Sequence, residues 1–314
     1  MKKNSFLTAL LVCVAMLGAK AQNKNMYKAD TIVDGKGNVI VNVYSAQTVV
    51  DGNGNIITRD YDVAAFDEIS IILPATVNYT VADDYSCRVT LDENLFEYLA
   101  IHTEGDKLSL GYVNEKVQHT NLTPTKFVIG ISAPTIEEIG MVGSGDFCFV
   151  TPYEAHRLKI QTAGSGNVIF NEAANFHRFE MQIAGSGKLI CKKLQADHLH
   201  LNVAGSGDMH IESGTAKTAD ISVAGSGDVC IGSGTVKSAN ISVAGSGTVE
   251  TRCEMELMNF NIAGSGTIRY LGDVNVSGSN MGGELRRIDL ENKKTEKKCC
   301  DEKQKKTKTQ GTTF

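Results

Sequence analysis

Two aspartates, Asp208 and Asp228, stand twenty residues apart, and each directly follows a Gly-Ser-Gly tripeptide. If twenty residues make one turn of a repeating structure, the two carboxylates lie next to each other and could share a calcium ion. A short polar side chain that leaves a tight turn also bonds nearby backbone, and this structural role fits better. The position one repeat earlier is Lys188, which weakens a cation site. Asp208 and Asp228 are therefore weak metal candidates, and neither a metal site nor a cofactor is predicted.

Three histidines, His198, His200 and His210, could converge with Glu212 if they flank the corner of neighbouring turns. Zinc requires three or four ligands within tetrahedral reach. Histidines scattered over a surface explain the same spacing more simply, so no zinc site is predicted.

A His-Arg pair recurs at His156-Arg157 and His177-Arg178, one repeat apart. A polysaccharide hydrolase needs paired carboxylates, and a lyase needs calcium-binding acids with a basic partner. The repeated pair is neither constellation, so the protein is expected not to be an enzyme. A polysaccharide-processing protein that uses the Asp208/Asp228 edge with calcium stays open as the alternative.

The elements that position these residues follow from a repeat. Gly-Ser-Gly occurs seven times, in steps of 21, 21, 20, 20, 20 and 19 residues, and Ile-Ser-Val-Ala-Gly-Ser-Gly occurs intact at 221–227 and 241–247. Glycine tolerates positive φ and lets the backbone pass close to the next turn of chain, so these tripeptides are read as corners. The predicted turn glycines are Gly143, Gly145, Gly164, Gly166, Gly185, Gly187, Gly205, Gly207, Gly225, Gly227, Gly245, Gly247, Gly264 and Gly266.

Apolar and polar residues alternate before and after each corner, which is typical of strands with one buried face. One unit of about 20 residues cannot bury its apolar face alone, whereas stacked units can. The sequence therefore predicts an all-β fold, a single-stranded parallel β-helix, right-handed by the crossover rule. A β-propeller, with about 40 residues per blade, is the weaker alternative.

Equivalent positions of stacked coils should form columns. Two columns should point inward, one from Leu158 through Met181 or Ile183, Leu201, Ile221 and Ile241 to Phe260, the other through Phe147, Val168, Leu189, Met209, Val229, Val249 and Ile268. The predicted outward contact column is Gln161, Gln182, Asn202, Ser222, Ser242 and Asn261. A solvated polar face is the ordinary interpretation of that column, and a flat surface for glycan or protein contact is the functional one.

The chain divides by composition into four parts. Lys2 and Lys3, an apolar run and a small-x-small site predict a secretory signal peptide cut between Ala21 and Gln22. The predicted divisions are a signal peptide at 1–21, a leader or cap of short strands at 22–62, the β-helix at 63–290 with its Gly-Ser-Gly coils at 143–279, and a lysine-rich flexible tail at 291–314.

Composition excludes several classes of protein. The 31 glycines among 314 residues lack a period of three and come with only 4 prolines, which excludes collagen. A hydrophobic content of 42% argues against disorder, and a net charge of −5 gives no support to nucleic-acid binding. No apolar run beyond the N-terminus is long enough to span a membrane.

The cysteines show neither CxxC nor a zinc-finger spacing. Cys148 and Cys230 hold equivalent positions four coils apart, too far for a disulfide, and Cys191 is expected to act as a small core residue. Cys299 and Cys300 are the better candidates for disulfides between chains.

The signal peptide, Phe66-Asp-Glu-Ile69 and the recurring Ala-Gly-Ser-Gly-Asp coils together resemble the head GIN domain family, over residues 63–290. The family comprises exported bacterial proteins, common in Bacteroidetes, that are described as auto-transporter adhesins. The resemblance implies a β-helix related in shape to pectin lyases, adhesion as the role, and no catalytic residues carried over.

These observations predict an exported, non-enzymatic protein that contacts a glycan or an envelope or surface protein through polar columns. Its predicted location is the periplasm, the outer membrane or the outside of the cell. It is expected neither to cross a membrane nor to bind nucleic acid. A structural envelope component that assembles with itself through its coil ends stays open.

Overall fold

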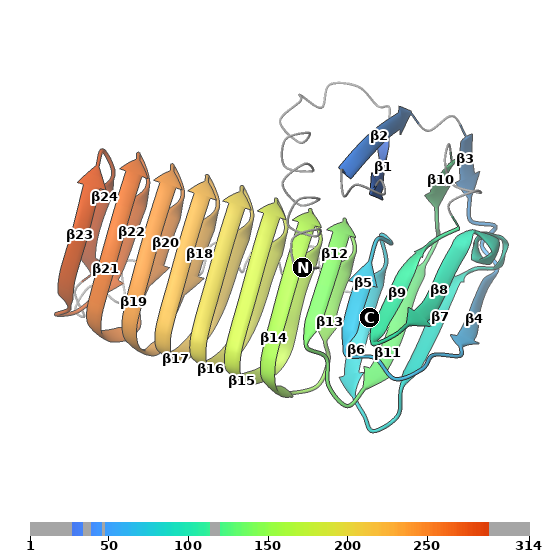
Figure 1. The fold of residues 1–314 in the computed structure, drawn as a ribbon, viewed down its shortest axis with the longest axis horizontal. Coiled ribbons are helices and arrows are strands. Elements are labelled where there is room, and N and C mark those ends of the chain that lie inside the picture. The colour runs from blue at the N-terminus through green and yellow to red at the C-terminus, as the bar shows by residue number, and fades with distance from the viewer. Residues whose placement is uncertain (1–26, 34–38, 46–47, 114–119, 289–314) are drawn as a thin grey trace. The chain divides into compact units, whose positions relative to one another are not determined.

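The computed structural model describes residues 27–33, 39–45, 48–113 and 120–288. These residues contain 24 strands and one short 3₁₀-helix (Figure 1). Stacked parallel coils form a β-solenoid of about eight turns, which confirms the predicted all-β, parallel β-helical class. The predicted signal peptide, its Ala21/Gln22 cleavage site and the lysine-rich tail lie outside the described residues.

The chain forms two units, one up to Cys148 with Gln161–Gly166, the other Phe149–Ile160 with the residues from Asn167 onward. The elements of the first part of the chain are β1 (Tyr27–Val33), β2 (Val39–Ser45), β3 (Thr48–Asp51), β4 (Ile56–Tyr61), β5 (Glu68–Ile71), β6 (Thr76–Val81), β7 (Ser86–Asp92), η1 (Glu93–Tyr98), β8 (Leu99–Glu104), β9 (Lys107–Tyr112), β10 (Thr120–Thr123), β11 (Phe127–Ala133), β12 (Glu138–Gly143), β13 (Asp146–Phe149) and β14 (Tyr153–Gly164).

The first unit combines two kinds of strand pairing. β5 pairs in parallel with β9 and β12, and β6 pairs in parallel with β11. β7 is antiparallel to both β4 and β11, and β8 is antiparallel to β9. Residues 63–142 fall within the predicted β-helix of 63–290, and the antiparallel pairs among them were not predicted. Alternation of apolar and polar residues cannot distinguish parallel from antiparallel pairing, because it reports only which face is buried.

The second unit is a stack of parallel coils (Figure 1). Its strands are β15 (Asn167–Gly185), β16 (Lys188–Gly205), β17 (Asp208–Gly225), β18 (Asp228–Ile231), β19 (Gly234–Gly245), β20 (Thr248–Thr251), β21 (Glu254–Gly264), β22 (Thr267–Leu271), β23 (Asn275–Met281) and β24 (Glu284–Ile288).

The register between coils follows the repeat length. β16 and β17 pair residue for residue with an offset of 20, so that Leu201 lies beside Ile221 and Gly205 beside Gly225. The coil of β15 is one residue longer, and its pairing with β16 shifts between Phe170 and Ala173. A local bulge therefore absorbs the extra residue and leaves the rest of the coil in register.

The columns that this register produces fill the core of the second unit. Val168, Leu189, Met209, Val229, Val249 and Ile268 form one column, and every member is at most 1% exposed. Met181, Leu201, Ile221, Ile241 and Phe260 form another. Phe260, which was expected inside, is only half-buried, because its neighbour in the next coil is Gly278, which has no side chain to cover the ring.

Candidate functional site

One sheet face of the second unit carries two neighbouring columns of polar side chains. The first column is Glu180, His200, Asp220, Asn240 and Asn259, and the second is Gln182, Asn202, Ser222, Ser242 and Asn261. Alternate residues of a strand point to the same face, so the two columns stand side by side with one inward-facing residue between them along the chain. The second column contains five of the six residues predicted as an outward contact column. The sixth, Gln161 of the first unit, is 3% exposed and is not part of a solvated column.

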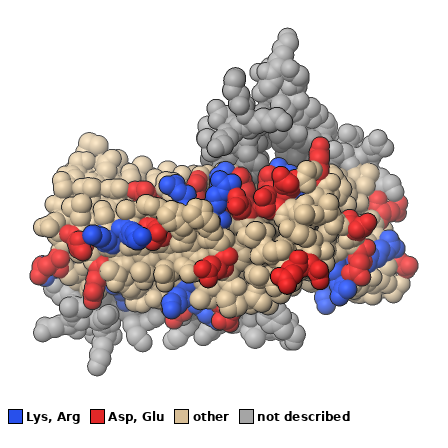
Figure 2. All heavy atoms as spheres, turned by 60° about the horizontal axis from the view of Figure 1, so that its bottom comes forward, with Lys and Arg blue, Asp and Glu red and all other residues tan. Residues whose placement is uncertain are grey.

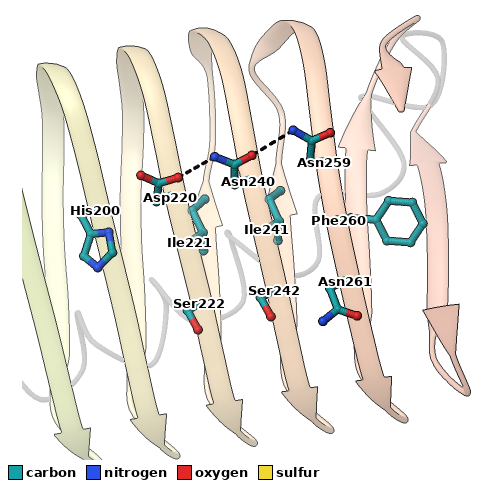
Figure 3. A pocket seen from close by; sticks show the side chains of 10 residues that line it. All are labelled: His200, Asp220, Ile221, Ser222, Asn240, Ile241, Ser242, Asn259, Phe260 and Asn261. Carbon is teal, nitrogen blue, oxygen red and sulfur yellow. Dashed lines mark hydrogen bonds between the residues drawn. The ribbon is translucent and has the colours of Figure 1, made fainter. Parts of the chain in front are cut away.

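Hydrogen bonds run along the first column from coil to coil. Asn240 Nδ2 donates to Asp220 Oδ1 over 2.7 Å, and Asn259 Nδ2 donates to Asn240 Oδ1 over 3.0 Å (Figure 3). In the second column Ser279 Oγ donates to Asn261 Oδ1 over 2.9 Å. These bonds fix the amide planes, so their remaining donors and acceptors have defined directions.

A shallow groove of about 350 Å³ lies over these columns. It is lined by His200, Asp220, Ile221, Ser222, Asn240, Ile241, Ser242, Asn259, Phe260 and Asn261 (Figure 3). Side-chain size explains where the groove lies. Glu180, Gln182 and His200 are long or bulky, whereas Ser222 and Ser242 leave the sheet uncovered. The next outward column over these coils consists of Ala204, Ala224, Ala244 and Ala263, whose small side chains do not fill the space.

The aspartates that follow the corners have backbone partners. Asp208 Oδ1 accepts the N–H of Asp228 over 3.3 Å, and Asp228 Oδ1 accepts the N–H of Thr248 over 2.9 Å. Each carboxylate thus links its coil to the next one, the structural role that the sequence favoured. Among the residues that the structure describes, no group of three or more His, Cys, Asp or Glu side chains is arranged to hold a metal ion.

The three histidines considered for zinc take different positions. His200 lines the groove, while His210 lies after the corner, beside Cys230 of the next coil. His198 Nδ1 lies 2.9 Å from Thr218 Oγ1, an ordinary contact between adjacent coils. The structure therefore separates residues that sequence spacing alone had grouped.

A row of charged side chains follows another corner of the second unit. The imidazoles of His156 and His177 stack with centroids 4.7 Å apart, and His177 Nδ1 lies 2.9 Å from Asp197 Oδ2. Lys217 Nζ lies 2.9 Å from Asp197 Oδ1. Lys217, and next to it His177, hold the pKa of Asp197 below its ordinary value. The sequence showed the repeated histidines, but it gave no signal that Asp197 and Lys217 continue the same row.

A buried ion pair in the second unit was also not predicted from the sequence. Glu250 is 2% exposed, and its carboxylate meets Arg252 Nε at 2.7 Å and Arg269 Nη1 at 3.5 Å. Glu250 and Arg269 are direct neighbours in register, so an acid and a base at equivalent positions of adjacent coils were the signal that could have revealed it.

The cysteines of the coils are mostly buried thiols. Cys87, Cys148, Cys191 and Cys253 are free, whereas Cys230 is disulfide-bonded, which the spacing of the cysteines did not predict. Burial raises the pKa of Cys87 and Cys191 to about 12 and that of Cys148 and Cys253 to about 11. The free thiols are therefore unsuited to act as nucleophiles. Cys299 and Cys300 lie outside the described residues.

Charged side chains of both signs are interspersed on the face seen in Figure 2, and no broad field of one sign covers it. No helix in the described part of the chain has the length and apolar character needed to cross a membrane. Fold and site together define a β-solenoid that presents a regular polar surface.

The chain belongs to the head GIN domain family. The family model described as "Putative auto-transporter adhesin, head GIN domain" matches residues 65–274, which confirms the resemblance drawn from the sequence. No curated protein matches the chain.

Solved structures of Parabacteroides proteins share the fold. A "Putative lipid binding protein" from Parabacteroides distasonis is 33% identical, with a TM-score of 0.73 over 77% of this chain and 100% of that one. A "putative adhesin" from the same species is 25% identical, with a TM-score of 0.69 over 76% and 100%. A putative adhesin from Parabacteroides merdae, 23% identical with a TM-score of 0.70 over 77% and 99%, shows the fold alone.

Proposed function

We propose that the protein is an exported, non-enzymatic adhesin-like β-solenoid that binds a cell-surface or envelope partner through the polar columns of its second unit. The observation that carries this proposal is the pair of columns, in which hydrogen bonds along the first hold Asp220, Asn240 and Asn259 in one orientation. Repeated, oriented polar groups on a rigid sheet favour recognition, because little side-chain entropy is lost on binding.

Binding is favoured over catalysis because the best acid pair for polysaccharide cleavage is engaged elsewhere. Asp208 and Asp228 each accept a backbone N–H from the next coil. A general acid or nucleophile must instead be directed at substrate. The adhesin description of the family and the predicted signal peptide support export and surface contact.

Lipid binding, the property named for the Parabacteroides distasonis relative, is the second function to test. It has less support here, because six of the ten lining residues carry amide, hydroxyl or carboxylate groups, although apolar atoms make up most of the exposed surface of the groove.

The test uses the chain from Gln22 onward, labelled with a fluorophore and incubated with intact bacteria, isolated envelopes and phosphatidylethanolamine–phosphatidylglycerol vesicles. Saturable binding to cells or envelopes, with none to vesicles, is expected. Binding to vesicles alone would replace the proposal with lipid binding, and cleavage of a polysaccharide would replace it with catalysis. Protease treatment of intact cells, followed by detection of the protein, reports whether it is on the surface or in the periplasm.

A further inference from the structure

The side chains around the groove over the polar columns are smaller and carry less charge than those on the earlier coils of the same face. Along the axis of the coil stack, Arg178 and His198 give way to Thr218 and Ser238 in one column, and Gln182 and Asn202 give way to Ser222 and Ser242 in another. We propose that this groove binds an extended neutral oligosaccharide that lies along the solenoid axis and crosses the coils. This inference rests on the proposed function and names the class of ligand that the polar columns recognise.

The hydrogen-bonding groups of the groove match a ligand rich in hydroxyls. The amide of Asn240 both donates and accepts along the column, which leaves one N–H and one oxygen lone pair for a ligand. Ser222 and Ser242 each present a hydroxyl that can donate and accept at the groove. Sugar hydroxyls both donate and accept, so each of these groups finds a partner in a glycan chain.

The spacing of the groups fits a chain laid along the axis. Equivalent side chains recur at each coil, at the strand separation of about 4.8 Å. One sugar residue of an extended polysaccharide has nearly this length, so successive sugars meet equivalent groups on coils β17, β19 and β21. The groove volume of about 350 Å³ lies at the small end of ligand sites, which run from about 300 to 1,000 Å³. A segment of about three sugars fits that description.

The charge of the groove selects against acidic glycans. Among the described residues that line the groove, Asp220 is the only carboxylate, and the other polar groups are amides, hydroxyls and His200. A uronic acid in register with Asp220 would place two negative charges together, which is unfavourable.

A protein ligand is disfavoured by the absence of deep anchor pockets in the lining. Protein interfaces depend on a few aromatic or arginine side chains inserted into well-packed pockets. The groove is shallow, and its floor consists of serine and asparagine side chains bordered by exposed Ala224 and Ala244. The methyl groups of these alanines suit the C–H surface of a sugar ring.

Isothermal titration of the chain from Gln22 with cellohexaose, mannohexaose and chitohexaose tests the proposal, with hexagalacturonic acid as the acidic comparison. At least one neutral hexasaccharide is expected to bind, at least tenfold more tightly than the acidic one. Ser242→Tyr fills the groove and should weaken that binding more than tenfold. Asn240→Ala, which removes one donor and one acceptor without adding bulk, should weaken it at least threefold.

Thr235→Tyr is the matched control, because Thr235 is an exposed residue on the same coil and is not part of the groove lining. It should bind the hexasaccharide like the parent protein. The inference is overturned if no neutral hexasaccharide binds, or if Ser242→Tyr and Asn240→Ala both bind as the parent does. If Ser242→Tyr still binds cells or envelopes as the parent protein does, this inference is wrong and the proposed function stands. If the parent protein itself does not bind cells or envelopes, the proposed function is wrong.

Discussion

At the scale of single residues, Asp92 shows how one carboxylate organises a loop. It is fully buried, and its oxygens accept the N–H groups of Gly54 at 2.8 Å and Thr125 at 2.7 Å. Burial by itself would raise the pKa of Asp92, but backbone hydrogen bonds from Gly54, Thr125 and Lys126 outweigh it and leave the pKa below its ordinary value. No pattern in the sequence linked Asp92 to the loop that it holds.

Replacing this carboxylate should cost stability in a pH-dependent way. Asp92→Asn leaves buried N–H groups without a charged acceptor and should lower the free energy of unfolding by about 2–3 kcal/mol at pH 7. Because the folded pKa is lowered, the stabilisation is complete above the unfolded value of about 3.9 and is lost as the pH falls through the folded pKa. Urea unfolding between pH 3 and 7 should therefore show the gap between parent and variant narrowing towards acid. Asp106→Asn, on an exposed turn, should leave stability unchanged, and a gap independent of pH would contradict this account.

The buried thiols allow a second test at this scale. With a pKa of about 12, Cys87 and Cys191 have very little thiolate at pH 8, so alkylation by iodoacetamide should be on the order of a thousandfold slower than for a free thiol. Mass spectrometry of peptides should find these residues unmodified in the folded protein and modified after denaturation. Rapid labelling of folded protein would show that these coils open far more often than their packing implies.

At the scale of the element, the corner between strands depends on two glycines for different reasons. Gly225 has a φ of 130°, which side chains with a Cβ rarely adopt, and a Cβ there would overlap the carbonyl oxygen of Gly205. The third residue of each corner approaches the coil below: a Cβ on Gly207 would lie 2.6 Å from the carbonyl oxygen of Gly187. The serine between the two glycines of each corner has neither constraint.

Substitution at one corner separates these roles. Gly225→Ala introduces both backbone strain and a clash with rigid backbone, and should lower the free energy of unfolding by at least about 2 kcal/mol. Ser226→Ala, whose side chain is exposed, should change it by less than about 0.5 kcal/mol. Guanidinium unfolding followed by circular dichroism measures both. Equal stability of the two variants would mean that the corner relaxes without cost.

The repeat made the coils predictable, because a constant length fixes which residues stack. The inward column from Val168 to Ile268 could be read from the sequence for this reason. Other features depend on what occupies the neighbouring coil: Phe260 is half-buried because Gly278 follows it, and the groove exists because serines stand where other coils have larger side chains. The antiparallel pairs of β4, β7, β8 and β9 were not predictable, because they join segments that share no repeat.

At the scale of the whole molecule, the stack of the second unit behaves as a one-dimensional array. Each coil contacts chiefly the coils before and after it, so stability is approximately a sum over neighbouring interfaces. β16 and β17 have the same register positions as β17 and its partners β18 and β19. One complete coil should therefore be removable without changing the side chains that its neighbours must meet.

Deletion of residues 208–227 tests this modularity, because it removes one period of 20 residues and joins Gly207 to Asp228. Leu189 then meets Val229 and Leu201 meets Ile241, so every inward column stays apolar. The circular dichroism spectrum should keep its strand signal, and the melting temperature should fall by less than about 10 °C, equivalent to a few kcal/mol at this size. Deletion of residues 208–217, half a period, would bring polar positions into the core and should abolish cooperative melting. If the two deletions behave alike, the stack is not held by column register.

The full-period deletion also bears on binding. If it folds but binds neutral hexasaccharides more weakly, the loss follows from removing Asp220 and Ser222, since the groove then spans two coils instead of three.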